Sequence, residues 1–369
     1  MKFTVLNWNI GGAKFLEEKT REERERTRAK FNEALLTIIT DRDVGPQPDV
    51  ITLQEIVRYR EPDDLEVKDL FSEIPGYSYF PFPLIDTKII SSKAKWNKIL
   101  KNSDWHPRTY FAQGNAFLIK NTAPHFPVWD LSDLEQTRPG ECGDHFIELV
   151  HLDSGLYFGD RNTEPRAALV AHFICDPVDL SSEVSRGDGR KPLDIFVVNL
   201  HLTTLMLERE GVPEIDAQAA KIRQSQLDVV FNGIVSRYNS WKRSGYRERG
   251  DPRKPEAYET FDRHSPVWVI AGDFNFTEES AEYAYIKRVN FIDTVPEDGK
   301  KSRWGHGTKA SGVGNDPTLT LDYIFAGPKF VSLDPAIVAE MHRNRVIHDH
   351  KLRASDHYPV LSSMTLIPS

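Results

Sequence analysis

The sequence predicts an α/β protein that forms one large domain. Strand-like runs rich in β-branched and aromatic residues alternate with amphipathic helical segments along the chain. The length of 369 residues would allow about two domains. The sequence contains neither a Pro-rich or Ser/Gly-rich linker nor a repeat of fixed period, so residues 1–369 are best interpreted as a single layered unit.

The expected elements follow one another along the whole chain. Buried strands are predicted at residues 3–10, 50–53, 115–120, 167–174, 194–202, 267–274, 320–325 and 360–365. Residues 17–40 start as a charged run and become apolar at Phe31 and Leu35, which predicts a helix with one buried face. Residues 216–238 carry apolar side chains at helical spacing, and both helices are expected to cover a sheet.

Polar segments interrupt this pattern in four places and are interpreted as loop insertions. They lie near residues 86–108, 176–192, 242–263 and 298–317. Loops of this length often carry substrate recognition. The aromatic-rich stretch 71–85 is interpreted as a connection that packs against the core.

Composition excludes several classes of protein. Hydrophobic residues make up 39% and charged residues 28%, which excludes disordered and fibrous chains. The formal net charge of −8 does not favour a protein that coats nucleic acid or an anionic membrane. The two cysteines, Cys142 and Cys175, form neither a disulfide framework nor a zinc-binding spacing. With no signal peptide and no apolar run near the ~20 residues of a membrane span, a cytoplasmic protein is expected.

Polar side chains stand where the apolar runs end. They are Asn9, Glu55, Asn199, His201, Asp273, Asn275, Asp322, Asp356 and His357. Strand ends that turn from apolar residues to carboxylate, amide and imidazole groups direct these groups to one rim of a sheet. Each residue alone has an ordinary structural explanation, but the whole set predicts a functional site.

The residue types in this set favour a particular chemistry. Carboxylates and carboxamides are hard oxygen donors of the kind that hold Mg²⁺ or Mn²⁺. The two histidines offer acid, base or phosphate-contacting groups near neutral pH.

The ordered series WNI, LQE, NLHL, GDFN, LDYIF and SDHYPV resembles the endonuclease/exonuclease/phosphatase superfamily, which has the DNase I-like fold. The resemblance extends from Asn9 to Val360 in the order of the family's motifs. It implies a four-layer α/β/β/α sandwich, with two packed mixed β-sheets between helices, and metal-dependent hydrolysis of phosphate esters.

The resemblance also implies roles for the strand-end residues. Glu55 would be the principal ligand of Mg²⁺ or Mn²⁺, with Asn9 and Asp356 beside it. Asp273 would position and deprotonate the attacking water, and Asn275 would hydrogen-bond that water or the phosphate. His357 would contact the phosphate or act as the base, and Asp322 would accept the other ring proton of His357. His201 and Asn199 would contact the phosphate, or His201 would give a proton to the leaving oxygen.

Arg166, in EPRAALVAHF, resembles an element that lies near the metal site in some members of the family. A strand-start charge exposed to solvent is the alternative interpretation of this arginine. The histidines of MHRNRVIHDHK have no matching carboxylates and are interpreted as a solvated loop.

The motifs define the type of bond and not the substrate. The basic insertion between Lys242 and Lys254, and Trp304 beside basic residues, favour phosphodiesters of nucleic acid or of nucleotide-derived compounds. A phosphatase or phospholipase C-like enzyme that acts on a small phosphorylated metabolite or lipid, whether sphingomyelinase-like or inositol-phosphatase-like, is the alternative. A non-catalytic binding module is a third hypothesis, and no membrane span or obligate protein partner is expected.

Overall fold

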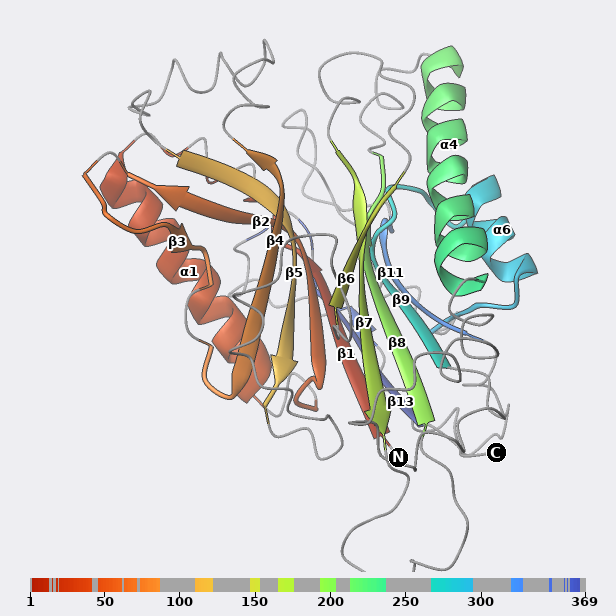
Figure 1. Ribbon diagram of the computed structural model, residues 1–369, viewed down its shortest axis with the longest axis horizontal. Coiled ribbons are helices and arrows are strands. Elements are labelled where there is room, and N and C mark those ends of the chain that lie inside the picture. The colour runs from red at the N-terminus through yellow and green to blue at the C-terminus, as the bar shows by residue number, and fades with distance from the viewer. Residues whose placement is uncertain are drawn as a thin grey trace, which may run out of the picture.

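The computed structural model contains two β-sheets that pack face to face, with helices on both outer surfaces (Figure 1). It describes residues 2–12, 15, 18, 20–41, 46–61, 63–71, 74–86, 110–121, 147–152, 165–175, 193–203, 213–236, 267–294, 320–327, 345–346, 355, 357 and 359–365. Apart from Asp86, the four predicted insertions lie outside these residues, so the single-domain interpretation of residues 1–369 stays a prediction.

The first sheet runs in the order β12-β13-β1-β2-β5-β4, and β3 pairs with β2. Its strands are β1 (Lys2–Asn9), β2 (Val50–Arg60), β3 (Lys68–Asp69), β4 (Tyr77–Asp86), β5 (Tyr110–Lys120), β12 (Arg345–Val346) and β13 (Val360–Thr365). Strand β1 is parallel to β2 and antiparallel to β13, so the sheet is mixed.

The second sheet runs in the order β10-β11-β9-β8-β7-β6. Its strands are β6 (Ile147–His151), β7 (Ala167–Cys175), β8 (Leu193–His201), β9 (Val267–Asp273), β10 (Ile292–Asp293) and β11 (Asp322–Ala326). Strands β8 and β9 are parallel, and β11 is antiparallel to β9. This sheet is therefore also mixed, as predicted.

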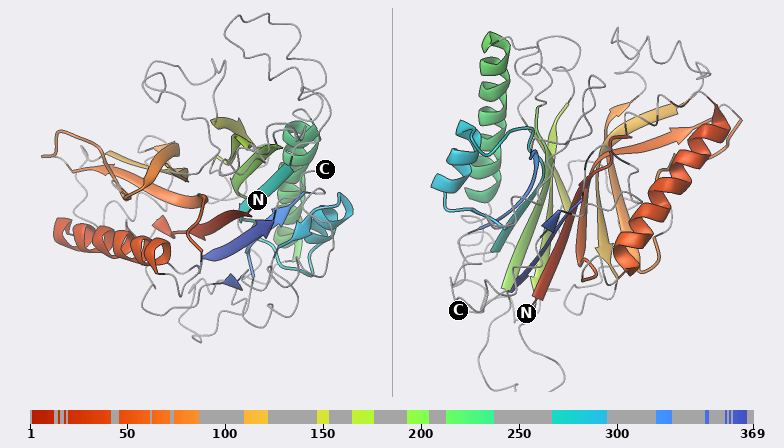
Figure 2. Two further views of the ribbon diagram at one scale, coloured as in Figure 1. Left: turned by 90° about the horizontal axis from the view of Figure 1, so that it is seen from below. Right: turned by 180° about the vertical axis from the view of Figure 1, so that it is seen from behind.

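Helices cover the outer face of each sheet (Figure 2). They are α1 (Arg21–Thr40) on the first sheet, and α4 (Pro213–Asp228), its π-helical continuation η5 (Val229–Val235) and α6 (Ala281–Arg288) on the second. Helix α1 begins later than predicted because Thr20 caps it: its hydroxyl accepts from the Glu23 amide, and the Glu23 carboxylate accepts from the Thr20 amide. The predicted four-layer sandwich is confirmed.

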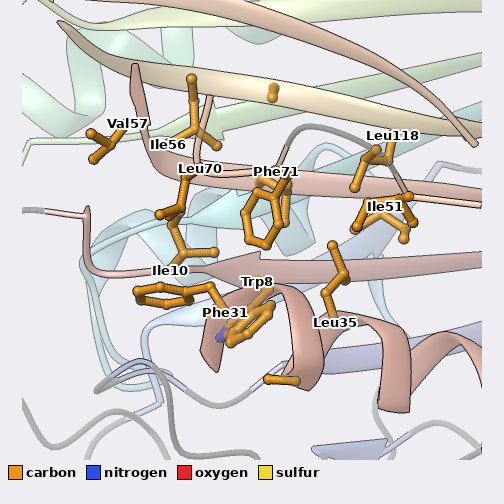
Figure 3. Packing of buried hydrophobic residues seen from close by; sticks show 14 of the residues in the cluster. Trp8, Ile10, Phe31, Leu35, Ile51, Ile56, Val57, Leu70, Phe71 and Leu118 are labelled. Carbon is orange, nitrogen blue, oxygen red and sulfur yellow. The ribbon is translucent and has the colours of Figure 1, made fainter. Parts of the chain in front are cut away.

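Three apolar layers hold the four structural layers together. Figure 3 shows the layer between α1 and the first sheet, where Trp8 of β1 packs beside Phe31 and Leu35 of the helix. Phe3 and Val5 of β1 belong instead to the layer between the two sheets. This alternation places successive side chains of β1 on opposite faces, so Asn7 and Asn9 also face the second sheet.

Strand β4 corrects the interpretation of residues 71–85 as a connection. Tyr77–Asp86 pairs with β5 along nearly its whole length. The strand contains two prolines, Pro81 and Pro83, and proline lacks an amide donor. The structure places β4 at the edge of the sheet, where a missing donor is tolerated.

None of the helices in the described part of the chain is both long and apolar enough to cross a membrane.

Candidate active site

Residues from both sheets meet at one rim of the inter-sheet layer. In the second sheet, His201 at the end of β8 pairs with Asp273 at the end of β9, and Asp273 pairs with Asp322 at the start of β11. In the first sheet, Asn9 ends β1 next to Gln54 of β2. The alternation that places Val269 and Ala271 between the sheets also directs Asp273 into this layer.

Glu55 reaches the site from a β-bulge in β2. Residues 54 and 55 together oppose the single residue Asn115 of β5, because the register shifts between Leu53 and Ile56. The backbone of Glu55 is left-handed, with φ at 56°, which is unusual for a residue that carries a Cβ. Bulges re-aim side chains, and this one directs Glu55 towards its partners Asn9 and Gln113.

Two glycines allow the chain to pass close to this bulge. A Cβ atom on Gly12 would overlap the carbonyl oxygen of Glu55, and one on Gly114 would overlap the carbonyl oxygen of Phe82 in β4. Gln113 donates to the Glu55 carboxylate at 3.1 Å from Nε2 to Oε2. The sequence reasoning missed these three residues, because close backbone approach and a cross-strand partner are visible only after the strands have been paired.

Asp273 is the centre of the hydrogen-bond network in the site. Its Oδ2 accepts from Asn9 Nδ2 at 2.9 Å, and its Oδ1 accepts from the backbone amide of Asn275 at 3.0 Å. Burial, followed by the charge of Asp322, raises the pKa of Asp273 to about 7. A carboxylate with this pKa can accept a proton near neutral pH.

The turn after Asp273 is fixed by Asn275. Its backbone φ is 53°, and its side-chain Nδ2 donates to the carbonyl oxygen of Leu202 at 3.1 Å. Asn275 therefore holds the Asp273 turn against the end of β8.

His357 enters the site from the segment that precedes β13. Its Nδ1 lies 2.8 Å from Asp322 Oδ2, and its Nε2 lies 3.9 Å from Asp273 Oδ2. The Ser355 hydroxyl donates to the carbonyl oxygen of Asn9 at 2.8 Å and accepts from the His357 amide at 3.0 Å. Ser355 thus ties the histidine to the end of β1, a role that the SDHYPV motif contained but the sequence analysis did not assign.

His201 lies on the other side of Asp273, with Nε2 at 3.5 Å from Asp273 Oδ2. Arg166, which directly precedes β7, is buried and places its Nη1 atom 2.9 Å from His201 Nδ1. Burial, with the positive charge of Arg166 next, places the pKa of His201 well below its usual range. Arg166 is therefore part of the site interior, and the alternative of a solvent-exposed charge is wrong.

Asn199 lies deeper than the residues above. Its Nδ2 donates to the carbonyl oxygens of Leu53 and Ala116, and its Oδ1 accepts from Gln54 Nε2 at 2.7 Å. The side chain is fully buried, and both amide protons are used by these bonds. Asn199 therefore links the two sheets behind the site, which corrects the expectation that it contacts the phosphate.

Asn9, which is expected to be a metal ligand, hydrogen-bonds to two carboxylates in the site. Its Oδ1 accepts from the Gly11 amide at 2.9 Å, which orients its NH₂ group towards Glu55 Oε1 and Asp273 Oδ2. Asn9 therefore presents a donor to both carboxylates and fixes their positions. Asp356 and Trp304 lie outside the described residues.

The donor set fits a hard divalent cation. Carboxylate oxygens of Asp273 and Asp322 lie within 4.8 Å of each other beside His357, and Asn9 connects Glu55 to this group. Asp322 Oδ1 is buried without a hydrogen-bond partner. Three carboxylates that converge with one unsatisfied oxygen are an arrangement that a cation would stabilise.

Comparisons with known proteins agree with this architecture. The sequence model of the Endonuclease/Exonuclease/phosphatase family matches residues 6–357. The human Nocturnin catalytic domain with bound sulfate anion is similar at a TM-score of 0.50 and 14% identity, over 99% of this chain and 94% of that chain. An endonuclease/exonuclease/phosphatase from Bacteroides vulgatus has a TM-score of 0.50 and 13% identity, with 100% of both chains covered. At these identities the similarity shows the fold. A search of curated proteins found no match.

Proposed function

Because the chain belongs to the Endonuclease/Exonuclease/phosphatase family, we propose that it is a Mg²⁺- or Mn²⁺-dependent phosphodiesterase. We further propose nucleic acid or nucleotide-derived compounds as its substrates. The observation that carries the proposal is the meeting of Glu55, Asp273 and Asp322 with two histidines at one rim, where Asp273 has a pKa of about 7.

Glu55 is the principal residue that would hold the cation, together with Asp356 and the unpaired oxygen of Asp322. When bound, the cation would polarise a phosphate oxygen and offset the negative charge that develops there. Asn9 keeps the Glu55 and Asp273 carboxylates in position through its NH₂ group. The strained bulge and Gln113 fix the direction of Glu55.

The protein's own groups supply the proton chemistry. Asp273 takes a proton from the attacking water, and its buried setting makes it a stronger base than an exposed carboxylate. The backbone amide of Asn275 and the NH₂ group of Asn9 hold its two oxygens in a fixed orientation. An imidazole beside it gives a proton to the leaving oxygen, so that an alcohol and a phosphomonoester result.

The test is hydrolysis, with Mg²⁺ or Mn²⁺ and with EDTA, of single-stranded DNA, duplex DNA, RNA, a bis-aryl phosphodiester and an aryl phosphomonoester. Glu55→Gln and Asp273→Asn should each abolish turnover. Glu22→Gln changes the same group on the exposed surface of α1 and should retain it. Metal-dependent cleavage of the diesters supports the proposal. Cleavage of the monoester alone would refute it in favour of a phosphatase.

A further inference from the structure

The two histidines beside Asp273 have chemically opposite partners. His357 Nδ1 meets a carboxylate, Asp322 Oδ2, at 2.8 Å. His201 Nδ1 meets a guanidinium, Arg166 Nη1, at 2.9 Å. Both rings direct Nε2 towards Asp273 Oδ2, from 3.9 Å and 3.5 Å respectively.

A guanidinium group has hydrogen-bond donors and no acceptor. At 2.9 Å from Arg166 Nη1, the Nδ1 atom of His201 must therefore be the acceptor and carry no proton. The single proton of a neutral His201 then lies on Nε2, the nitrogen that faces Asp273. A second proton, on Nδ1, would point at the positive charge of a buried arginine.

We propose that Arg166 holds His201 as a neutral imidazole with its proton on Nε2, so that His201 donates a hydrogen bond to a phosphate oxygen and transfers no proton. The consequence for catalysis rests on the proposed function, whereas the position of the proton is a property of the protein alone. Arg166 is thereby a positioning residue, since its contact with His201 orients the ring.

The chemistry explains why such a histidine cannot act as the general acid. An imidazole with one proton would become an imidazolate anion if it gave that proton away. It can instead stabilise charge that develops on a phosphate oxygen, as neutral imidazole donors do in other active sites. His357 differs from His201 in this respect, because its Nδ1 lies 2.8 Å from the Asp322 carboxylate, which can accept a proton from that nitrogen.

If His201 transfers no proton, the other imidazole beside Asp273, His357, is left to supply the proton to the leaving oxygen, and the transfers balance as follows. The water oxygen forms a bond to phosphorus, and the bond from phosphorus to the leaving oxygen breaks. The water proton moves to Asp273, and the leaving oxygen takes the Nε2 proton of His357. Afterwards the proton on Asp273 returns to His357 Nε2 across the 3.9 Å that separates the two groups.

The first experiment locates the proton without any turnover. In metal-free protein labelled with ¹⁵N-histidine, two-dimensional NMR at about pH 7 distinguishes protonated from unprotonated ring nitrogens. The signals of His201 are assigned, among 12 histidines, by their loss in His201→Gln. We expect a proton on Nε2 and none on Nδ1. A proton on Nδ1, alone or together with one on Nε2, would overturn the proposal.

Two variants of Arg166 test the cause. Arg166→Lys keeps a cationic donor and should keep the Nε2 proton, whereas Arg166→Met removes the donor and should give a mixture of the two tautomers. An unchanged spectrum in folded Arg166→Met would refute the role of Arg166. Should Arg166→Met fail to fold, the wild-type spectrum and the lysine variant still decide the question.

The second experiment separates a hydrogen-bond donor from a general acid. Diesters with an aryl or an alkyl leaving group are hydrolysed by wild type, His201→Ala and His357→Ala. Loss of a donor to the phosphate should lower kcat about 10²-fold for both leaving groups in His201→Ala. The loss in His357→Ala should be larger for the alkyl group, which needs a proton. A loss in His201→Ala that grows with the basicity of the leaving group would refute the proposal.

If the wild type cleaves no diester, the proposed function fails, and the NMR result still tests the proton position separately.

Discussion

Replacing Glu55 by glycine should remove activity and at the same time relieve strain in the fold. Glu55 has φ at 56°, where a residue with a Cβ carries a cost of about 1 to 2 kcal/mol that glycine does not. Glycine gains freedom in the unfolded chain, which offsets about 0.4 to 1 kcal/mol of this difference. We therefore expect Glu55→Gly to be about 0.5 to 1 kcal/mol more stable than Glu55→Ala.

The alanine variant is the proper reference because both substitutions remove the same carboxylate. Both lose the hydrogen bond from Gln113 at 3.1 Å, and both relieve the repulsion between Glu55 and Asp273. Only the Cβ at the left-handed position differs between them. For a chain of 369 residues the expected difference corresponds to about 0.6 to 1.3 °C in the thermal midpoint, which differential scanning calorimetry measures.

Asn290 provides a matched control outside the site. It has φ at 64° and directly follows the last turn of α6. Asn290→Gly should likewise be more stable than Asn290→Ala, with diester hydrolysis retained, whereas Glu55→Gly should have none. The strain argument for the bulge is refuted if the thermal midpoint of Glu55→Gly is no higher than that of Glu55→Ala while the two Asn290 variants show the expected order.

Three further variants test other parts of the structure. Ser355→Ala removes two buried hydrogen bonds that hold His357 and should lower kcat at least tenfold. Ser355→Thr keeps the hydroxyl and should retain most of the wild-type kcat. Equal kcat values in Ser355→Ala and wild type would contradict the positioning role. Gly12→Ala places a Cβ against the carbonyl oxygen of Glu55 and should weaken Mn²⁺ binding measured by calorimetry, and unchanged affinity would show that the bulge tolerates the displacement. Burial raises the pKa of Asp49, so ionised Asp49 costs stability that a neutral side chain does not. Asp49→Asn should therefore raise the thermal midpoint at pH 7. This gain in the midpoint should shrink as the pH falls through the raised pKa of Asp49, and it should vanish below the ordinary aspartate pKa near 3.9. A gain that does not depend on pH would exclude ionisation of Asp49 as its cause.

Much of the fold could be predicted from periodicity. The strands that line the inter-sheet layer are apolar along their length and turn polar at one end, so Asp273 and His201 could be placed at a rim before any sheet was paired. The strand β4 could not be recognised, because its prolines are acceptable only at a sheet edge, and edges exist only after strands are ordered.

Within the site, the sequence identified the residue types and missed several relationships between them. Nothing in the sequence places Arg166 beside His201, whereas the adjacent pairing of β7 and β8 does. The family resemblance implied that Asn199 contacts the phosphate together with its motif neighbour His201. Its deeper position, two residues back along β8, makes it a link between the sheets.

The sequence by itself determined that Asn9, His201 and Asp273 leave the core at strand ends, because alternation along each strand is a local property of the backbone. Only the tertiary structure decided which of these side chains meet and what each one can do. The left-handed bulge at Glu55 and the partners of the two imidazoles depend on strands that are distant in sequence. Neighbouring strands determine the position of the proton on each imidazole and the backbone strain at Glu55. The residues of a motif alone do not specify these neighbours.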